Sequence, residues 1–457
     1  MRKISLGTVS LIALAAMTTA GSAQVVSPET AAERLKNPLS SPCGPNERLM
    51  VQRCVSADLV EKLGKPLTTE RPKAQTNGDA RPGRAAGGFM AATKRMIYSA
   101  VPGSIVTYEV INRPKGEQTY KFEKRIVFED TPASERSELV SGMMANPVTN
   151  MVYVSTRGTL YAIDLATDKV VWKNRYDNGQ CCERGAVTPD GKTLVVGSNV
   201  RDFHYVIDAK TGALKGKIPM PASPGIHNMN LCPDGKIDFG APNGYTMSVA
   251  DVPTMKVTKT ITFTDHVRVF VINHDCSRIY ANENNLLGFE IADVKTGKII
   301  KRIEAPGEMW KAKWADPNLS FFGHGAPQHG IAMLADESEI WVPDAVNDQV
   351  LVYDNTGEWP VLDMKKSFKT NGEPNGWIVF GLDGKKAFMA SGDVVDVKTH
   401  KIVAQLKDEY GRYMDSEKTL EMLFDDNGHL KKTTLQFSNG DAQAVAARLA
   451  SQKSASN

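Results

Sequence analysis

The sequence lacks the short motifs that mark several common catalytic and cofactor sites. It contains no Cys-x-x-Cys-His, so no covalently attached c-type haem is expected. It also contains no Gly-x-Ser-x-Gly nucleophile elbow, no glycine-rich phosphate loop and no His-Glu-x-x-His zinc motif. No single motif therefore assigns a reaction, and function has to be argued from the residues that a fold would bring together.

Strong charge and long apolar runs are also missing. The 457 residues carry a formal net charge of only +3, which gives no electrostatic footprint for nucleic acid. Beyond the N-terminus no run of roughly 18 apolar residues occurs, so no membrane span is expected once the N-terminal segment is removed.

The N-terminus itself has the pattern of a secretory signal peptide. Arg2 and Lys3 provide a basic start, residues 6–17 an apolar segment, and residues 21–23 a small-residue cleavage site, so cleavage is expected after Ala23. No cysteine follows this site, which argues against a lipoprotein. The sequence therefore predicts a periplasmic or secreted protein, in a compartment that permits disulfides.

The six cysteines fall into three pairs by position. Cys43 and Cys54 are close in sequence and are expected to form a disulfide. Cys232 and Cys276 occupy similar places in successive repeats, so a disulfide between them would join neighbouring repeats. Cys181 and Cys182 are adjacent and leave two interpretations open. They form a vicinal disulfide, which offers a flat apolar plate for stacking a ring, or each is free or pairs elsewhere.

A recurring Asp-x-x-Thr phrase at the end of apolar strand segments organises most of the sequence. Full copies begin at Asp164, Asp208, Asp251, Asp293 and Asp396, and a shortened copy begins at Asp354. The intervals between copies are 44, 43, 42, 61 and 42 residues in sequence order. A period in the low forties with several strands per unit is typical of a β-propeller. The Asp and Thr side chains are expected to close the turn between the outer strands of each blade.

This period divides the protein into four parts. They are a signal peptide (1–23), an irregular N-terminal extension and linker (24–85), an all-β propeller (86–440) and a C-terminal helix and tail (441–457). Seven blades are expected, with residues 433–437 as a strand that closes the ring. An eighth blade made from 408–440 and part of 45–85 is the alternative. The 61-residue interval predicts a long loop at 306–325, which favours a functional role because long loops often carry binding residues.

The start of the innermost strand of each blade is expected to face one mouth of a central channel. Aligning the blades by their turns brings polar or aromatic residues to this level, namely Glu183, Arg184, His227, Arg268, His329 and Trp377. Paired arginines and histidines favour an anionic ligand or a cofactor that carries carboxylates. The alternative is that these residues are polar only because the channel holds water.

Two family resemblances follow from particular stretches. His227 to Gly235, Gln328 to Met333 and Ile340 to Asp354 resemble the YVTN-type β-propellers of secreted bacterial proteins, over roughly residues 86–407. Cys181 to Gly185 resembles the adjacent-cysteine stretch of pyrroloquinoline quinone (PQQ) alcohol dehydrogenases, and Ala162 to Trp172 resembles their blade-docking motif. The second resemblance implies PQQ with calcium as the cofactor, a vicinal disulfide stacked on the quinone, and an external electron acceptor.

Three functional hypotheses remain. The first is a non-catalytic propeller that binds a small ligand or a periplasmic protein at its channel mouth and 306–325 loop. We place it first because the sequence indicates the propeller fold much more strongly than it indicates any catalytic site. The second is a PQQ-type oxidoreductase, with Cys181 and Cys182 stacking on the cofactor and Arg184 or Arg268 binding its carboxylates. The third is a propeller lactonase or hydrolase, with His227 or His329 as general base and Arg268 stabilising the oxyanion.

Overall fold

The computed structural model describes most of the residues after position 93. The described residues are 47–50, 53–56, 94–114, 117–129, 139–179, 181–198, 200–220, 226–242, 244–306, 327–371 and 376–455. The protein divides into two compact units, Met1–Lys62 and Leu63–Asn457. The predicted signal peptide and nearly all of the 306–325 loop lie outside the described residues, as does Cys43, so the Cys43–Cys54 disulfide stays a prediction.

The first unit contains one described element, an antiparallel hairpin. It consists of β1 (Glu47–Met50) and β2 (Arg53–Ser56), with Leu49 paired to Cys54.

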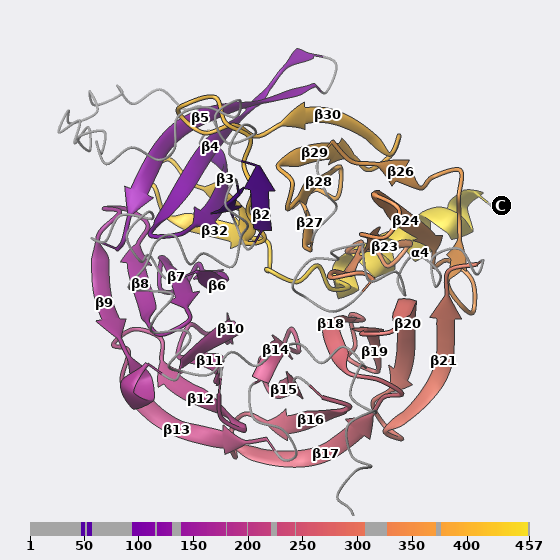
Figure 1. Ribbon diagram of the computed structural model, residues 1–457, viewed down its shortest axis with the longest axis horizontal. Coiled ribbons are helices and arrows are strands. Elements are labelled where there is room, and N and C mark those ends of the chain that lie inside the picture. The colour runs from indigo at the N-terminus through magenta and orange to yellow at the C-terminus, as the bar shows by residue number, and fades with distance from the viewer. Residues whose placement is uncertain are drawn as a thin grey trace, which may run out of the picture. The chain divides into compact units, whose positions relative to one another are not determined.

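In the second unit the described strands form seven sheets that follow one another around a central axis (Figure 1). This arrangement confirms the predicted seven-bladed β-propeller. Blade 1 contains β3 (Lys94–Val101), β4 (Ser104–Asn112), β5 (Gln118–Val127), β31 (Thr419–Phe424) and β32 (Leu430–Thr433). Blade 2 contains β6 (Val140–Asn146), β7 (Met151–Thr156), β8 (Leu160–Asp164) and β9 (Val170–Asn174), followed by the short 3-10 helix η4 (Tyr176–Asn178). Blade 3 contains β10 (Cys181–Val187), β11 (Thr193–Ser198), β12 (Phe203–Asp208) and β13 (Leu214–Pro219).

The remaining four blades continue the ring in sequence order. Blade 4 contains β14 (Ile226–Leu231), β15 (Ile237–Pro242), β16 (Thr246–Asp251) and β17 (Lys256–Thr262). Blade 5 contains β18 (Val267–Ile272), β19 (Arg278–Glu283), β20 (Leu286–Asp293) and β21 (Lys298–Glu304). Blade 6 contains β22 (Ala332–Met333), β23 (Glu339–Asp344), β24 (Gln349–Asp354), β25 (Val361–Leu362) and β26 (Phe368–Lys369). Blade 7 contains β27 (Ile378–Phe380), β28 (Lys386–Met389), β29 (Asp393–Asp396) and β30 (Lys401–Gln405).

The Asp-x-x-Thr phrase closes the turn between the two outer strands of its blade, as predicted. In blade 2 the Thr167 backbone N–H and hydroxyl donate to Asp164 Oδ1 at 2.8 and 2.7 Å, and the same pair of bonds recurs between Thr211 and Asp208 at 3.0 Å each. The residue after the threonine has a left-handed backbone, with φ of 58° at Asp168. A type I turn followed by one left-handed residue forms a bulge that matches the twist of a hairpin, which explains the repeated use of the phrase.

The ring closes by pairing strands from the two ends of the propeller. In blade 1, β31 pairs with β3, which comes from the N-terminal side, and β32 continues the sheet toward the axis. The prediction that 433–437 is the closing strand is therefore wrong, and so is the eighth blade from 408–440. Both failed because 419–433 supplies the inner strands that β3, β4 and β5 lack. Closure of this kind leaves no open sheet edge between the first and last blades.

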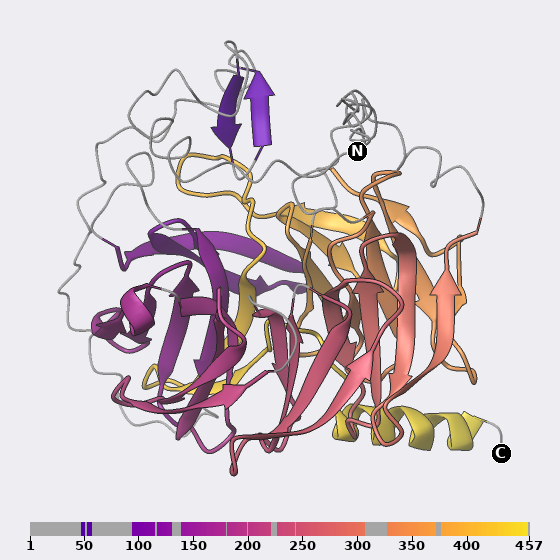
Figure 2. The ribbon, with the colours of Figure 1, turned by 60° about the horizontal axis from the view of Figure 1, so that its bottom comes forward.

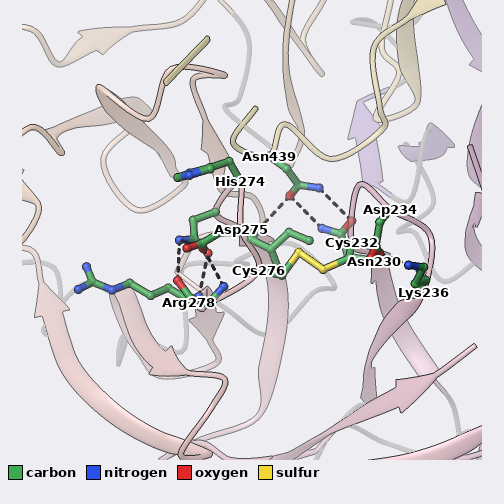
Figure 3. Close-up of a disulfide and its surroundings, with 12 residues drawn as sticks. Asn230, Cys232, Asp234, Lys236, His274, Asp275, Cys276, Arg278 and Asn439 are labelled. Carbon is green, nitrogen blue, oxygen red and sulfur yellow. Dashed lines mark hydrogen bonds between the residues drawn. A yellow bond between two sulfur atoms is a disulfide. The ribbon is translucent and has the colours of Figure 1, made fainter. Parts of the chain in front are cut away.

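Residues 434–441, called the C-terminal strap below, run from β32 across the ring at the ends of the inner strands. The Met333 N–H donates to the Ser438 carbonyl in blade 6, and the Phe380 N–H donates to Ser438 Oγ in blade 7, each at 2.9 Å. The Asn439 amide exchanges hydrogen bonds with Asn230 of blade 4 at 2.9 and 3.0 Å (Figure 3). The strap thus ties together blades that are far apart in sequence.

The strap leads into α4 (Ala442–Ala455), which lies at one end of the strands (Figure 2). The helix was predicted at 441–450 and extends further. The Arg448 guanidinium holds it by donating from Nε to the Asp336 carbonyl at 2.7 Å. No helix in the described residues is long and apolar enough to cross a membrane.

The predicted disulfide between blades 4 and 5 is present. Cys232 follows β14 and Cys276 precedes β19, and both side chains lie in one apolar cluster with Phe239, Phe270 and Ile279. The apolar core continues between other neighbouring blades, which explains why each blade is stable only next to the others.

Candidate functional site

In each of blades 3 to 5 the inner strand has a β-bulge near its start. The bulge coincides with the residues that were predicted to face the mouth of the central channel. In β10 the register skips between Cys181 and Gly185, so Glu183 and Arg184 have no direct partner on β11. The register of β14 skips between Ile226 and Asn228, and that of β18 between Val267 and Phe270. Bulges re-aim side chains at the rims of barrel-like folds. Their positions coincide with Glu183, Arg184, His227 and Arg268, the residues that the sequence alignment of blades selected.

Arg184 is the most unusual of these residues because its charged side chain is only 3% exposed. Its guanidinium carbon lies 3.4 Å from the centroid of the Trp377 indole, a close cation–π contact between blades 3 and 7. Nη1 donates a hydrogen bond to Asn228 Oδ1 in blade 4. Burial lowers the pKa of Arg184 to about 10, and the nearby carboxylates of Glu183 and Glu417 oppose this shift.

A second charged pair lies next to this stack, just before β31. The Lys418 ammonium donates to Glu417 Oε2 at 2.7 Å and lies 5.4 Å from the Trp377 indole centroid. Burial, and then the positive charge of Arg184, lower the pKa of Lys418 to about 8. The two cations therefore share one small volume beside one indole.

Glu183 completes the cluster and is a carboxyl with a strongly raised pKa. Burial raises the pKa of Glu183 to about 7, while Arg184, Lys418 and Arg157 lower it and Glu417 raises it further. The Glu183 carboxyl is therefore protonated more readily than an exposed glutamate, and in its neutral form it leaves Glu417 as the carboxylate beside the two cations.

His329 and Trp377 meet at the junction of blades 6 and 7. The His329 ring lies edge-on to the Trp377 indole at 6.4 Å, and its Nδ1 is 3.8 Å from Glu417 Oε1. A side chain on Gly330 would place its Cβ 1.9 Å from the carbonyl oxygen of Gly376, so glycine alone lets these backbones pass. This close approach brings the histidine to the same level as the cation cluster.

Two other predicted residues are placed differently. The side chain of Arg268 turns away from the cluster, since Nε donates to Asn284 in its own blade. Its carbonyl accepts a hydrogen bond from Asn228 Nδ2, so Arg268 supports Arg184 through Asn228. His227 lies in β14, but its side chain is outside the described residues, and its role stays a prediction.

Cys181 and Cys182 form the predicted vicinal disulfide, but both side chains are 0% exposed. They belong to the apolar cluster that contains Met144, Tyr153 and Leu160. A planar ring would have to displace part of this cluster to stack on the disulfide. Within the described ranges, no three His, Cys, Asp or Glu side chains are grouped as a metal site would require. The buried Cys181–Cys182 disulfide does not fit a role as a stacking plate for PQQ.

The structure adds residues that sequence reasoning missed. Asn228 follows the predicted His227 by one position and holds Arg184 in place. Glu417 and Lys418 precede the ring-closing strand, and Gln436 and Phe437 belong to the strap. No sequence pattern marks the last four, because they reach the site only through closure of the ring by the C-terminal segment.

Comparisons with known proteins add a structural likeness only. No protein-family model matches the sequence, and no curated protein sequence matches it. Among solved structures, the protein is similar to Kuenenia stuttgartiensis hydrazine synthase, with 13% sequence identity and a TM-score of 0.48. The similarity covers 71% of this protein and 99% of the other chain. At this level it supports no conclusion about function, and membership of the YVTN-type family stays a prediction.

A separate carboxyl pair lies in blade 5. The Thr264 hydroxyl is 2.9 Å from Glu283 Oε2 and 2.8 Å from Glu290 Oε1. The Thr264 hydroxyl donates toward both carboxyls, and its one proton cannot satisfy both at the same time. Burial and the neighbouring Glu290 raise the pKa of Glu283 to about 8. Arg302 lies 3.1 Å from Glu290 and 3.7 Å from Glu283, and its charge partly offsets the rise in the Glu283 pKa.

Replacing Glu283 with glutamine is expected to stabilise the protein at alkaline pH. The unfolded protein loses the Glu283 proton above about pH 4.5, whereas the folded protein keeps it up to about pH 8. Stability due to this group is therefore complete below pH 4.5 and is lost as pH rises through 8. A glutamine mimics the protonated acid without this loss, so the free energy of unfolding at pH 9 should rise by roughly 1 kcal/mol or more. Urea unfolding at pH 5 and 9 measures it, and a gain in stability that is equally large at both pH values would contradict the raised pKa of Glu283.

Proposed function

We propose that this propeller binds a small anionic ligand at the centre of the ring, beside Arg184, Lys418 and Trp377. The observation that carries the proposal is the burial of Arg184 without an ion pair among the described residues: its guanidinium donates to the neutral Asn228. A buried cation is costly unless an opposite charge accompanies it. Glu183 and Glu417 lie near Arg184 but form no ion pair with it among the described residues, and a bound anion would supply that direct contact to the guanidinium stacked on the indole.

The position of the cluster supports a binding role. Its residues come from blades 3, 6 and 7 and from the segment before β31, and they converge at the axis where propellers commonly hold ligands. We further propose that the protein acts in the periplasm or outside the cell as a YVTN-type propeller, with the 306–325 loop contributing to ligand or partner recognition.

Binding is tested by a thermal-shift titration of the full-length protein with acetate, and with acetamide as a neutral molecule of the same shape. Acetate should raise the melting temperature in a saturable way, because it binds only the folded state, and acetamide should not. Arg184→Met should abolish the shift. Lys298→Met removes the same charge from an exposed position of β21 and should leave the shift intact. If acetate raised the melting temperatures of the wild type and of Arg184→Met equally, this result would contradict the proposal.

The same titration has a predicted pH dependence. As pH rises through about 7, Glu183 ionises beside Arg184, Lys418, Arg157 and Glu417 and competes with the ligand for the positive charge. The affinity for acetate should therefore fall by roughly tenfold between pH 6 and 8. Glu183→Gln should reduce this dependence, and the part that remains comes from Lys418, which loses its charge near pH 8. PQQ with calcium serves as a further probe, and a shift with that pair that acetate does not reproduce would favour the quinone hypothesis instead.

A further inference from the structure

Several buried hydrogen-bond donors at the centre of the ring have no acceptor within the described residues. They are Arg184 Nε, Trp377 Nε1 and Gln436 Nε2, and the buried hydroxyl of Ser155 is also without a partner there. Native proteins satisfy nearly all buried polar groups, so a group of unsatisfied donors indicates a missing acceptor. The three N–H groups can only donate, and a ligand that satisfies them must therefore present acceptor oxygens.

These donors come from one small region. A Cβ on Gly142 would lie 2.7 Å from Ser155 Oγ, 3.0 Å from the Arg184 Cα and 3.3 Å from Gln436 Oε1, so these three residues all border Gly142. The Trp377 indole contacts both Arg184 and the Phe437 ring, with centroids of the two rings 4.9 Å apart. The strap thus borders the cluster, through Gln436 and Phe437.

The orientation of the Gln436 amide is fixed by a backbone contact. The Met143 N–H donates to Gln436 Oε1 at 2.8 Å, so the oxygen is already used and the NH2 group is the free end. Gln436 is 3% exposed, so solvent does not satisfy this group. A donor held in this way is positioned for a ligand rather than for the solvent.

We infer that the ligand is a compact oxyanion, of the size of a small carboxylate, and that Gln436 of the C-terminal strap is one of its binding residues. This inference rests on the proposed function and adds the size of the ligand and the role of the strap. We expect a compact ligand because Ser155, Arg184, Trp377 and Gln436 are nearly fully buried, so a bulky ligand would have to displace the side chains packed around them. The carboxylate oxygens accept from the guanidinium, the indole and the amide, and charge-assisted bonds of this kind are the stronger ones.

Ligand binding is then coupled to closure of the ring by the strap. The strap is held to blade 1 by the Thr434 N–H, which donates to the Glu421 carbonyl at 2.9 Å, and to blade 5 by the Gly440 N–H, which donates to the Ile272 carbonyl at 3.1 Å. A ligand that also binds Gln436 stabilises the closed position of this segment. Its backbone amides should consequently exchange hydrogen more slowly when the site is occupied.

The test uses the full-length protein with acetate, acetamide and benzoate. Acetate should bind and slow hydrogen exchange of the 434–441 peptide severalfold, whereas acetamide and the bulkier benzoate should do neither. Gln436→Met keeps the size of the side chain but removes the donor, and it should weaken acetate binding about tenfold. Gln443→Met makes the same change at an exposed position of α4, outside the strap, and should leave the affinity for acetate within about twofold.

The outcomes separate this inference from the proposed function. If acetate binding depends on Arg184 but Gln436→Met binds as tightly as wild type and exchange of the strap is unchanged, the role of the strap is wrong and the anion site stands. If benzoate binds as well as acetate, the compact size is wrong. If no anion shifts the melting temperature, internal water satisfies the donors, and both proposals fail.

Discussion

Replacing Cys232 and Cys276 together with alanine is expected to lower the free energy of unfolding by about 3–4 kcal/mol. The disulfide spans 44 residues and joins blade 4 to blade 5, so its loss frees a long loop in the unfolded state. Both side chains are also buried in the apolar cluster between these blades, and alanine removes part of that packing. Urea unfolding at neutral pH under non-reducing conditions measures the change.

Two controls distinguish the cross-link from packing. Reduction of the wild-type protein before unfolding should reproduce most of the loss, and reduction of the double variant, which keeps Cys181–Cys182, shows how much the other disulfides contribute. The single Cys232→Ala variant should be destabilised to a similar extent, because the remaining thiol has no partner. Equal stability of the oxidised and reduced wild-type protein would show that the disulfide contributes nothing measurable.

Replacing Glu339 with glutamine is expected to cost about 2–3 kcal/mol at neutral pH. Glu339 lies at the junction of blades 6 and 7, where it accepts hydrogen bonds from Trp341 Nε1 at 2.8 Å and Lys366 Nζ at 2.7 Å, with His400 Nε2 at 3.0 Å. Burial alone would raise the pKa of Glu339, but these three donors lower it to about 2. The folded state therefore prefers the carboxylate form of Glu339. A glutamine side chain has an NH2 group in place of one oxygen, and this group cannot accept hydrogen bonds from the donors that face it.

The stabilisation that Glu339 provides depends on pH, and the direction of this dependence follows from the lowered pKa of Glu339. Because the folded pKa lies below the ordinary value of 4.5, the contribution of Glu339 is complete above about pH 4.5 and is lost as pH falls toward 2. The difference between wild type and Glu339→Gln should therefore be largest at pH 7 and small at pH 3. Glu358→Gln, on the exposed turn of the same blade, should be neutral at both. A difference that grew at low pH would contradict the lowered pKa of Glu339.

The two buried carboxyls show why pKa shifts have to be argued from surroundings. Glu283 faces another carboxyl and favours the proton, whereas Glu339 faces three donors and loses it. Glu283 ends β19 and Glu339 begins β23, and apart from the Trp341 indole two residues after Glu339 the groups that set the two pKa values come from elsewhere in the sequence. Their opposite dependence on pH is decided by which side chains the neighbouring strands and blades present.

The sequence alone determined the fold, the number of blades and the turn chemistry. An Asp that binds the backbone three residues on is a local interaction, as Asp164 and Thr167 show, and a repeat of local interactions is visible in one dimension. The sequence also predicted that Glu183, Arg184 and Trp377 lie at the same height along the axis of the ring, because they occupy equivalent positions near the start of the inner strand in their blades. The disulfide between Cys232 and Cys276 followed from the same equivalence.

Only the tertiary structure decided which of these residues meet and what closes the ring. Arg184 contacts Trp377 across nearly 200 residues of sequence, and Gln436 reaches the same place from the strap. The closing strand was misplaced because β31 and β3 pair across the whole length of the propeller, and no local pattern records such a pairing. Burial of the Cys181–Cys182 disulfide was likewise hidden, because it depends on side chains from blade 2. Local turns are encoded by neighbouring residues, whereas the site is formed by contacts between segments that only ring closure brings together.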